Sequence, residues 1–521
     1  MSDITFGTDG WRGVIAKDFT FENIEKVSYS TAEYFIKNPK ISNGVVVGYD
    51  ARFLSKEFAE TVSIILASRG IKVFLSDSIV STPMVSVGVI KLKAAYGIMI
   101  TASHNPPKYN GFKIKADYGG PARREDIAGV ENYLDYVEKS YHRLKKKYHL
   151  SINELVKKKL IKYVDLKDIY KKDLKNKFDI ELFSKNGLKV LYDPMYGSGQ
   201  GFFRDFIPEF DEIHGIFNPS FNNNNPEPLA INCKDTIEKI VNEKYDLGIV
   251  NDGDADRIGA IDEKGNFIST QQLFPIFLKY LVETNSLSGD VVKTVSVSDY
   301  VTRICNKNNI LYYETPVGFK YIAEYMVSQN VLIGGEESGG IGLKTHIPER
   351  DGIYNGLFLA KIMIERKKTL RELVSEIEEE YGKLYYDRID VHTTEDVKER
   401  VIKACKSNPQ FIGGFKVKNY SKIDGFKFIF DDGWLLVRSS GTEPILRFYA
   451  EATKMEKVQR LLKAALKLQW DNLMEEIIIE DKKRIGIIER LIIIMMFIVA
   501  FIGIMISEIE LKIISGLLFI T

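Results

Sequence analysis

Three aspartates in segment 245–257, YDLGIVNDGDADR, occupy alternate positions directly after an apolar run. Because such a run is typical of a buried strand, Asp252, Asp254 and Asp256 are expected in the loop that follows it. Three carboxylates this close repel one another unless a hard cation binds them, and oxygen ligands suit Mg²⁺ or Ca²⁺. An EF-hand is excluded, because Arg257 stands where that loop requires glycine. The segment predicts a metal site beside which Arg257 meets an anionic ligand; the alternative is a solvated acidic turn.

A serine loop follows a second apolar run, AAYGIMI, in segment 101–115, TASHNPPKYNGFKIK. Adjacent side chains on an extended segment point apart, so Ser103 and His104 are not expected to act as a dyad. If Ser103 carried a phosphate, the aspartate-bound cation could neutralise it, and Lys113 could shuttle a proton. The alternative is an Asx/Pro turn without chemistry.

A third loop carries groups that suit a sugar. Segment 334–342, GGEESGGIG, places Glu336, Glu337 and Ser338 between glycines and directly after an apolar run. Glycines let the backbone approach a ligand closely, and a carboxylate with a hydroxyl suits the hydroxyl groups of a sugar. The alternative is a plain glycine-rich turn.

Two arginine-containing segments could hold phosphate. Segment 438–444, RSSGTEP, combines small hydroxyl residues with a glycine, and it brings Arg438 close in sequence to Arg447. Exposed backbone N–H groups and a bidentate guanidinium form a phosphate cradle without a P-loop lysine. Another glycine-flanked arginine, Arg12, lies in segment 6–13, FGTDGWRG. The alternatives are a tight turn for the first segment and a structural turn for the second.

These loops require a scaffold of alternating strands and helices. Strand-like runs alternate with amphipathic stretches through most of the chain, and three of the runs end in polar turns, which favours repeated α/β units with parallel or mixed sheets. Short strands followed by one helix then indicate a separate domain. The expected fold class is α/β, with three similar α/β domains and a C-terminal α+β domain. The expected boundaries are 1–150, 151–265, 266–380 and 381–470, with an apolar tail at 471–521.

Bulk composition favours a multidomain cytoplasmic enzyme. With 521 residues the chain exceeds a single core. Lys and Arg number 72 against 71 Asp and Glu, so no net field attracts nucleic acid. The three cysteines share no metal-type spacing and argue against a disulfide framework. Residues 1–20 have no apolar core after a basic start, so no signal peptide is expected.

The tail contains an uncharged segment, 491–507, LIIIMMFIVAFIGIMIS. It nearly reaches the length of about 20 apolar residues that a bilayer crossing needs. A basic cluster at 482–484 precedes it, and the positive-inside rule would keep that side on the cytoplasmic face. One interpretation is a membrane anchor, which is not favoured. The others are an accidental extension without function and a helix packed on a partner subunit.

The motifs TASHNP, DGDADR, GEESGG and SGTEP follow one another along the chain, and with them the chain resembles the α-D-phosphohexomutase family, the phosphoglucomutases and phosphomannomutases. The resemblance covers residues 1–470. It implies four domains around a central cleft: three similar α/β units and a final domain of another fold. Four motifs in this order are far more specific than any one of them alone.

The resemblance also implies a role for each loop. Ser103 would be the phosphoserine, its phosphate and the three aspartates would hold Mg²⁺, and Arg257 would contact that phosphate. Family members that end the sugar motif with histidine use it near the proton transfer, but here that position is Gly340, and Lys320 and His346 are the available substitutes. The other implied positions are catalytic ones at His104, Lys113 and Arg12, and substrate-binding ones at Lys320, Glu336, Ser338, His346, Arg438, Ser439, Ser440, Gly441, Thr442 and Arg447.

The reaction that the resemblance implies interconverts hexose 1-phosphate and hexose 6-phosphate, with glucose favoured, through a phosphoserine and a hexose 1,6-bisphosphate. The expected cofactors are Mg²⁺ and, as activator, glucose 1,6-bisphosphate. Mannose, glucosamine and pentose phosphates stay open as substrates, and so does the oligomeric state. A metal-dependent sugar phosphatase would not explain Ser103 or SGTEP, and an inactive sugar-phosphate binding protein would have lost its nucleophile. The expected partners are sugar phosphates and not nucleic acid.

Overall fold

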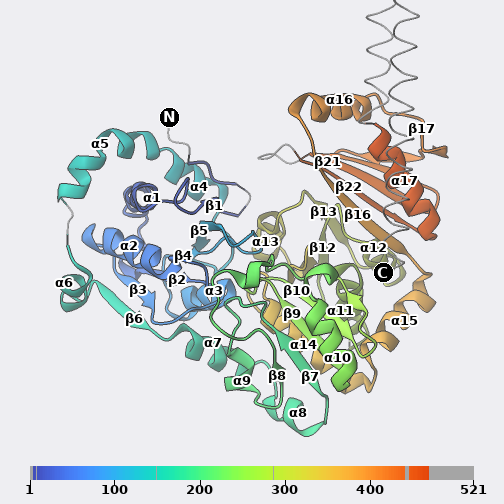
Figure 1. Ribbon diagram of the computed structural model, residues 1–521, viewed down its shortest axis with the longest axis horizontal. Coiled ribbons are helices and arrows are strands. Elements are labelled where there is room, and N and C mark those ends of the chain that lie inside the picture. The colour runs from blue at the N-terminus through green and yellow to red at the C-terminus, as the bar shows by residue number, and fades with distance from the viewer. Residues whose placement is uncertain (1–3, 8, 148–149, 285–286, 440–444, 469–521) are drawn as a thin grey trace, which may run out of the picture.

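Figure 1 shows the computed structural model, in which the described residues are 4–7, 9–147, 150–284, 287–439 and 445–468. The apolar tail at 471–521 and the expected phosphate ligands Ser440, Gly441 and Thr442 lie outside these ranges. Within the ranges, no helix combines the length and the apolarity that a bilayer crossing requires.

The first sheet has six strands, in the spatial order β1 (Trp11–Val14), β5 (Tyr109–Ala116), β4 (Tyr96–Ile100), β2 (Val45–Tyr49), β3 (Val73–Ser76) and β6 (Ile161–Val164). Strands β4, β2, β3 and β6 run parallel, whereas β5 is antiparallel to both of its neighbours. Every residue of β2 is buried, as is typical of a parallel strand covered on both faces. Strand β6 extends this sheet beyond residue 150.

The second and third sheets are built in the same way. The second has the order β11 (Phe267–Ile268), β10 (Ile258–Asp262), β9 (Leu247–Asn251), β7 (Val190–Asp193) and β8 (Asp211–Glu212). The third has the order β15 (Ile341–Leu343), β14 (Val331–Gly335), β12 (Asp290–Thr294) and β13 (Tyr312–Thr315). In both, the first of four consecutive strands pairs in parallel with the second and the third, and the fourth pairs antiparallel with the third.

Strands β2 to β5 of the first sheet repeat this arrangement, with the spatial order fourth, third, first, second. The three similar α/β units predicted from the sequence are thereby confirmed. In each unit the connection between the third and the fourth strand carries one of the motifs. These connections are the serine loop (101–108), the metal loop (252–257) and the sugar loop (336–340). The repeat therefore places the three motif-bearing loops at equivalent positions.

The helices of the three units alternate with these strands, and side-chain caps define several of their starts. Thr20 and Ser81, for example, accept hydrogen bonds from the backbone of the first turns of α1 and α3. The helices are α1 (Phe21–Phe35), α2 (Ser55–Ser68), α3 (Thr82–Lys91), α4 (Arg124–Glu131), α5 (Leu134–Lys147), α6 (Ile152–Lys157), α7 (Leu166–Lys175), α8 (Ile180–Lys185), α9 (Phe202–Phe206), α10 (Lys234–Glu243), α11 (Thr270–Thr284), α12 (Asp299–Lys307), α13 (Phe319–Ser328), α14 (Gly352–Arg366) and α15 (Leu370–Tyr381). Short 3₁₀ turns lie at Ile41–Asn43, Phe221–Asn223 and Ala230–Asn232.

The fourth unit has a different architecture, as predicted for an α+β domain. Its sheet is antiparallel, with the order β16 (Tyr385–His392), β22 (Ile445–Ala452), β21 (Gly433–Ser439), β20 (Phe426–Phe430) and β19 (Asn419–Ser421), and β17 (Phe411–Ile412) pairs separately with β18 (Phe415–Lys416). Helices α16 (Glu395–Lys406) and α17 (Met455–Lys467) contribute to the core of this unit. Trp434, Leu436 and Tyr449 pack instead against Val295 of the third unit.

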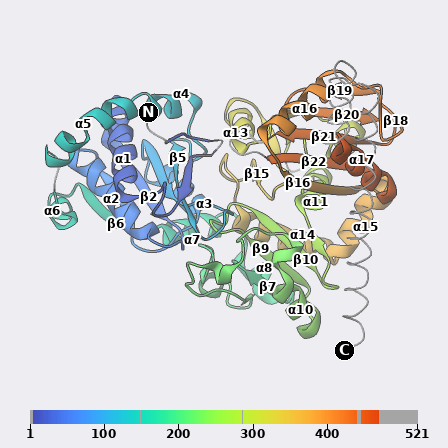
Figure 2. The same cartoon turned by 45° about the horizontal axis from the view of Figure 1, so that its top comes forward.

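The arrangement of the units brings the motif loops together. One hydrophobic cluster joins the first three units and includes Val46, Tyr192 and Leu357. Figures 1 and 2 both show the fourth unit, in orange, beside the third unit and apart from the first, which is blue. The loops are therefore contributed by separate units, and their geometry depends on how these units pack.

Candidate active site

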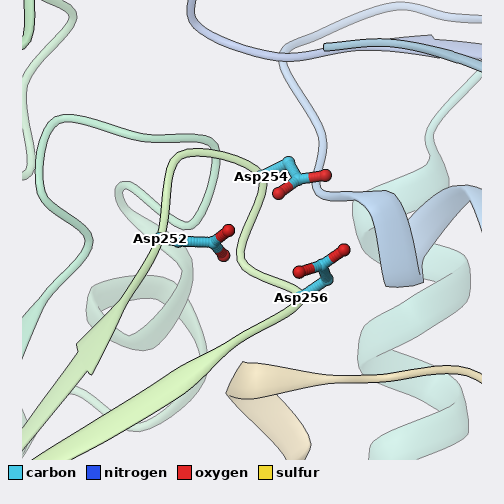
Figure 3. Close-up of side chains that lie close together, drawn as sticks. All are labelled: Asp252, Asp254 and Asp256. Atoms are coloured by element: carbon cyan, nitrogen blue, oxygen red, sulfur yellow. The ribbon is translucent and has the colours of Figure 1, made fainter. Parts of the chain in front are cut away.

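The metal loop brings the three predicted metal ligands together. Asp252, Asp254 and Asp256 each offer a carboxylate oxygen, and these oxygens lie within 4.8 Å of one another. All three side chains are fully buried. Figure 3 shows the three carboxylates turned toward the space between them, on the loop that joins β9 to β10. A donor set made only of oxygens suits a hard cation such as Mg²⁺.

Two carboxylate oxygens of the aspartates are without hydrogen bonds to the described residues and could therefore bind such a cation. Lys113, on β5, places Nζ 2.9 Å from Asp254 Oδ2 and 3.3 Å from Asp256 Oδ2. The Oδ1 atoms of Asp254 and Asp256 are buried and have no hydrogen-bond partner among the described residues. Because a buried carboxylate oxygen without a partner is costly, these residues fit a divalent cation that takes up the unpaired oxygens.

The pKa values of Asp252 and Asp254 are shifted in opposite directions by their surroundings. Burial raises the pKa of Asp252 well above its ordinary value, and repulsion from Asp254 and Asp256 raises it further. Burial acts in the same direction on Asp254, but Lys113 and the hydroxyl of Thr82, 2.6 Å from Oδ2, outweigh it and lower the pKa. Burial lowers the pKa of Lys113, but the surrounding aspartates raise it above its ordinary value. Lys113 is therefore an ammonium ion in this site.

Ser103 lies against the metal loop. Its buried Oγ donates a hydrogen bond of 2.8 Å to Asp252 Oδ2. Its φ angle is 53°, in the left-handed region, so the expectation of an extended backbone is wrong at this residue. As a result Ser103 Oγ lies 3.4 Å from Nδ1 of His104, although the two side chains were expected to point apart. Burial, followed by the cations Arg257 and Arg12, lowers the pKa of His104 well below its ordinary value, which keeps the imidazole neutral.

Arg52, which the motifs did not predict, holds the serine loop. Its guanidinium donates at 2.6 to 2.9 Å to four backbone carbonyls, those of Ser103, Asn105, Pro106 and Tyr109. Its Nε lies 3.2 Å from Asp50 Oδ2, and both side chains are fully buried. The available signal was its place in GVVVGYDAR, where Arg52 comes three positions after the end of a buried strand and two positions after Asp50.

Arg350, also not predicted, connects three segments of the site. Its Nη2 lies 2.7 Å from Asp256 Oδ2 and 2.8 Å from Asp9 Oδ2. Its Nη1 lies 3.2 Å from Glu336 Oε2. Asp9 also contacts Lys113, at 2.8 Å. The metal loop, the sugar loop and the N-terminal segment thus share one network of charges.

The sugar loop borders a cavity of about 480 Å³, a volume that suits a small ligand. Glu336 is buried, and Ser338 is half-buried and lines the cavity together with Glu337. The second unit contributes Glu227 to the lining, and the fourth unit contributes Arg388. The cavity therefore lies where three units meet.

The fourth unit presents two of the predicted phosphate ligands side by side. Arg438 on β21 and Arg447 on β22 are direct cross-strand partners. Arg438 Nε lies 2.7 Å from Asp424 Oδ2, and Arg447 Nε lies 3.4 Å from Asp390 Oδ2. Like charges opposite each other on paired strands are unfavourable unless anions neutralise them, and each carboxylate does so here. Ser439, which follows Arg438, is half-buried. Two guanidinium groups in this arrangement can bind a phosphate.

The remaining predicted cations, Arg12, Arg257 and Lys320, lie on three different segments of the chain. Arg12 Nη1 lies 2.5 Å from Asn105 Oδ1 of the serine loop. Arg257 Nε lies 3.8 Å from Asp252 Oδ2 and has no hydrogen-bond partner among the described residues. Lys320 is half-buried near the start of α13, and burial, followed by Arg124, lowers its pKa. Arg257 is therefore placed to meet an anion beside the metal loop.

The contacts of His346 are with residues outside the metal loop. Its Nε2 lies 2.7 Å from Asp351 Oδ2, its Nδ1 lies 2.7 Å from Lys177 Nζ, and its ring stacks on Tyr354 at 4.2 Å. Both ring nitrogens are engaged in these contacts. The structure thus gives no support for His346 as a substitute for the histidine absent at position 340.

Family models match each unit of the chain. Those described as phosphoglucomutase/phosphomannomutase, alpha/beta/alpha domains I, II and III match residues 3–140, 168–265 and 269–381, and the C-terminal domain of the same family matches residues 361–468. The fold and the site define a sugar-phosphate isomerase that transfers a phosphoryl group. The chain belongs to the phosphoglucomutase/phosphomannomutase family.

Individual relatives agree with this assignment. The chain is 31% identical over 468 residues to a phosphoglucomutase/phosphomannomutase of Thermococcus kodakarensis, covering 89% of this chain and 98% of the relative. It is also 31% identical to a phosphoglucosamine/phosphogalactosamine mutase of Sulfurisphaera tokodaii, with coverage of 89% and 98%. The crystal structure of a putative phosphomannomutase from Thermus thermophilus superposes with a TM-score of 0.76 at 32% identity, covering 90% and 99% of the two chains.

Proposed function

We propose that the protein interconverts glucose 1-phosphate and glucose 6-phosphate, with Ser103 as the phosphoryl carrier. One observation carries this proposal: the buried hydroxyl of Ser103 donates a 2.8 Å hydrogen bond to Asp252, one of three aspartates whose carboxylates could hold a metal ion. A hydroxyl held there gains a phosphate whose charge the site can neutralise. A phosphatase with an aspartate nucleophile would not need this serine.

The residues divide the work between the two ends of the substrate. Arg438 and Arg447, with Ser439 beside them, bind the phosphate that does not react. Glu336 accepts hydrogen bonds from the sugar hydroxyls, and Ser338 donates to them or accepts from them. These bonds orient the free hydroxyl toward Ser103. Lys320, half-buried in α13, is a further cation for a substrate phosphate. The substrate thus spans the distance from the fourth unit to the metal loop.

Transfer breaks the bond between Ser103 Oγ and phosphorus and forms a bond from phosphorus to the free sugar hydroxyl. The hydroxyl loses its proton, and Ser103 Oγ gains one. We assign these proton movements to His104, which is neutral and lies 3.4 Å from Ser103 Oγ, as a proton acceptor, and to the ammonium of Lys113 as a proton donor. Arg257 and Arg12 meet the charge of the phosphoryl group. The bisphosphate then turns in the cleft, and its other phosphate returns to Ser103.

Asp252, Asp254 and Asp256 would hold a Mg²⁺ ion, which would neutralise charge on the transferring phosphoryl group. The fit rests on the oxygen-only donor set and on the unpaired Oδ1 atoms of Asp254 and Asp256. Glucose 1,6-bisphosphate would serve as activator, because it can phosphorylate Ser103 and leave as a monophosphate.

Glucose is the proposed sugar because the sugar motif reads GEESGG, whereas phosphoglucosamine mutases usually read GEQSGH. Mannose, glucosamine and pentose phosphates are the alternatives. The test is an assay of the purified full-length chain on the 1-phosphates of all four sugars, with Mg²⁺ and with or without the matching bisphosphate. Highest kcat/KM on glucose 1-phosphate, stimulated by the bisphosphate, supports the proposal. A preference for another sugar would reject glucose, and release of inorganic phosphate would favour a phosphatase.

We infer that the protein is cytoplasmic. We also infer that the tail at 471–521 has no part in catalysis. The four motifs end by Arg447, before the tail begins, which supports the inference that the tail is dispensable for catalysis. Cells expressing the chain with and without residues 471–521 should yield equal mutase activity in the fraction freed of membranes. Full-length protein that resists a high-salt wash and needs detergent, while the shortened chain does not, would establish the anchor instead.

A further inference from the structure

Gly340 leaves no room for a side chain, because the stem of Arg350 fills the adjacent space. A Cβ atom at position 340 would lie 2.2 Å from Cδ and 2.8 Å from Cγ of Arg350, far inside van der Waals contact. The backbone of Gly340 is not in the left-handed region. The close approach of Arg350, and not the backbone conformation, therefore requires glycine here.

The stem of Arg350 cannot move aside easily, since its guanidinium is fixed on several sides. The Nη2 atom contacts Asp256 and Asp9, and Nη1 contacts Glu336. The group also lies 5.5 Å from the centre of the Phe319 ring. Only 7% of the side chain is exposed. The position of the fork is thus set by the metal loop, the sugar loop and the N-terminal segment together.

We propose that Arg350 is a positioning residue for phosphoryl transfer, and that its fork fixes the spacing between Glu336 of the sugar loop and Asp256 of the metal loop. This inference rests on the proposed mutase function. Nη1 donates a hydrogen bond to Oε2 of Glu336, so that Oε1 can accept one from a ligand. Nη2 takes Oδ2 of Asp256, whose Oδ1 has no hydrogen-bond partner in the described part of the chain. Each carboxylate therefore keeps one oxygen for its ligand, a sugar hydroxyl or a cation.

Arg350 acts as a fixed cation and not as a proton carrier, because a guanidinium does not lose its proton in proteins. Its stem fills the space beside Gly340, the position at which some family members carry the histidine that Lys320 and His346 were expected to replace. Lysine should not replace it, since an ammonium is one point charge and lacks the two separate nitrogens with which Arg350 reaches Glu336 through Nη1 and Asp256 through Nη2. Arg350 and Gly340 therefore depend on each other. The stem of Arg350 occupies its place because residue 340 has no side chain, and a Cβ atom at position 340 would collide with that stem.

The test combines Arg350→Met, which keeps a stem beside Gly340 but removes the fork, with Arg350→Ala, which removes both. Each is made alone and together with Gly340→Ala, and Arg350→Lys completes the series. For every variant, kcat, KM for glucose 1-phosphate and the midpoint of thermal unfolding are measured. Arg366→Met is the matched control, because Arg366 pairs with Glu283 away from the site.

Both Arg350→Met and Arg350→Ala should lose about 100-fold in kcat, the effect of a misplaced reacting group, while KM stays within about threefold. Arg350→Lys should not restore kcat. Gly340→Ala should lower kcat and the unfolding midpoint in the wild-type background. It should also lower the midpoint in the Arg350→Met background, where a stem still fills the space, but not in the Arg350→Ala background. Arg366→Met should keep kcat.

Normal kcat in Arg350→Met would overturn the inference, and so would a raised KM with unchanged kcat, which would make Arg350 a direct substrate ligand. A harmless Gly340→Ala in the wild-type background would also overturn it. If Arg350→Ala does not fold, Arg350→Met and Arg350→Lys still decide the role of the fork. Wild-type protein without activity on any of the four sugar phosphates would reject the proposed function, whereas the unfolding series would still decide whether residues 340 and 350 share one space.

Discussion

Ser103 and Asp252 lie 149 positions apart in the chain, yet the hydroxyl of one donates a 2.8 Å hydrogen bond to the carboxylate of the other. Each residue lies in the connection between the third and the fourth strand of its unit. The contact therefore exists because two copies of one α/β arrangement pack with these connections facing each other. It joins the proposed phosphoryl carrier to the proposed metal site.

Replacing Ser103 by alanine should abolish turnover, because no other group would carry the phosphoryl. A loss on the order of 10⁴-fold or more in kcat is expected for removal of a nucleophile. Intact-mass analysis should show a phosphorylated fraction in the wild type and none in Ser103→Ala. Ser328→Ala, at an exposed serine of α13, is the control and should keep both activity and the phosphorylated fraction. Near-normal turnover in Ser103→Ala would place the nucleophile elsewhere.

Removal of divalent cations should stop the reaction reversibly. Treatment with EDTA is expected to eliminate activity, and added Mg²⁺ should restore it, because the unpaired oxygens of Asp254 and Asp256 need a cation. Asp254→Asn removes one ligand charge, so the Mg²⁺ concentration for half-maximal activity should rise roughly tenfold or more. Asp235→Asn, an exposed change in α10, should leave this concentration unchanged. Full activity in EDTA would contradict the assignment of the metal loop.

Arg438 and Arg447 should contribute to affinity more than to turnover. In the proposed complex each would form a charge-assisted contact to the non-reacting phosphate worth about 1.5–3 kcal/mol, so Arg438→Ala or Arg447→Ala should raise KM roughly 10- to 100-fold. The measurement is KM for both monophosphates, with Arg460→Ala on α17 as the control. Unchanged KM for both substrates would mean that the phosphate binds elsewhere.

Arg52 should matter for both stability and rate. Arg52→Met leaves the Asp50 carboxylate buried without its cation, which typically costs about 3–5 kcal/mol, so the midpoint of thermal unfolding should fall. The serine loop also loses four hydrogen bonds to its backbone carbonyls, and kcat should fall about 100-fold. The double variant Asp50→Asn with Arg52→Met should recover stability but not kcat. Recovery of both would show that Arg52 acts only on folding.

The motif loops could be predicted because each lies in one short segment. Asp252, Asp254 and Asp256 are neighbours in sequence, so their convergence on one metal position follows from the turn between β9 and β10 alone. The repeat of the α/β units was only suggested by the sequence, since polar turns after apolar runs do not specify strand order. The identical order of four strands in three sheets supplies what the spacing lacked.

The residues between the loops could not be predicted. Arg52 and Arg350 act through contacts with segments far away in the chain, and their partners are fixed only when the units pack. Ser103 shows a local limit: its φ of 53° reverses the direction expected for its side chain relative to His104. His346 shows the opposite limit, because a histidine close in sequence to the sugar loop bonds to Lys177 and Asp351 instead.

The most direct test of the mutase assignment is a single-turnover experiment with radioactive phosphate on Ser103. Protein labelled at Ser103 is mixed with excess unlabelled glucose 1-phosphate and Mg²⁺, and the products are separated after quenching. The label should leave the protein, appear first in glucose 1,6-bisphosphate and end at the 6-position of glucose 6-phosphate, while Ser103 regains an unlabelled phosphate. Label released as inorganic phosphate, or retained on the protein, would contradict the proposed reaction.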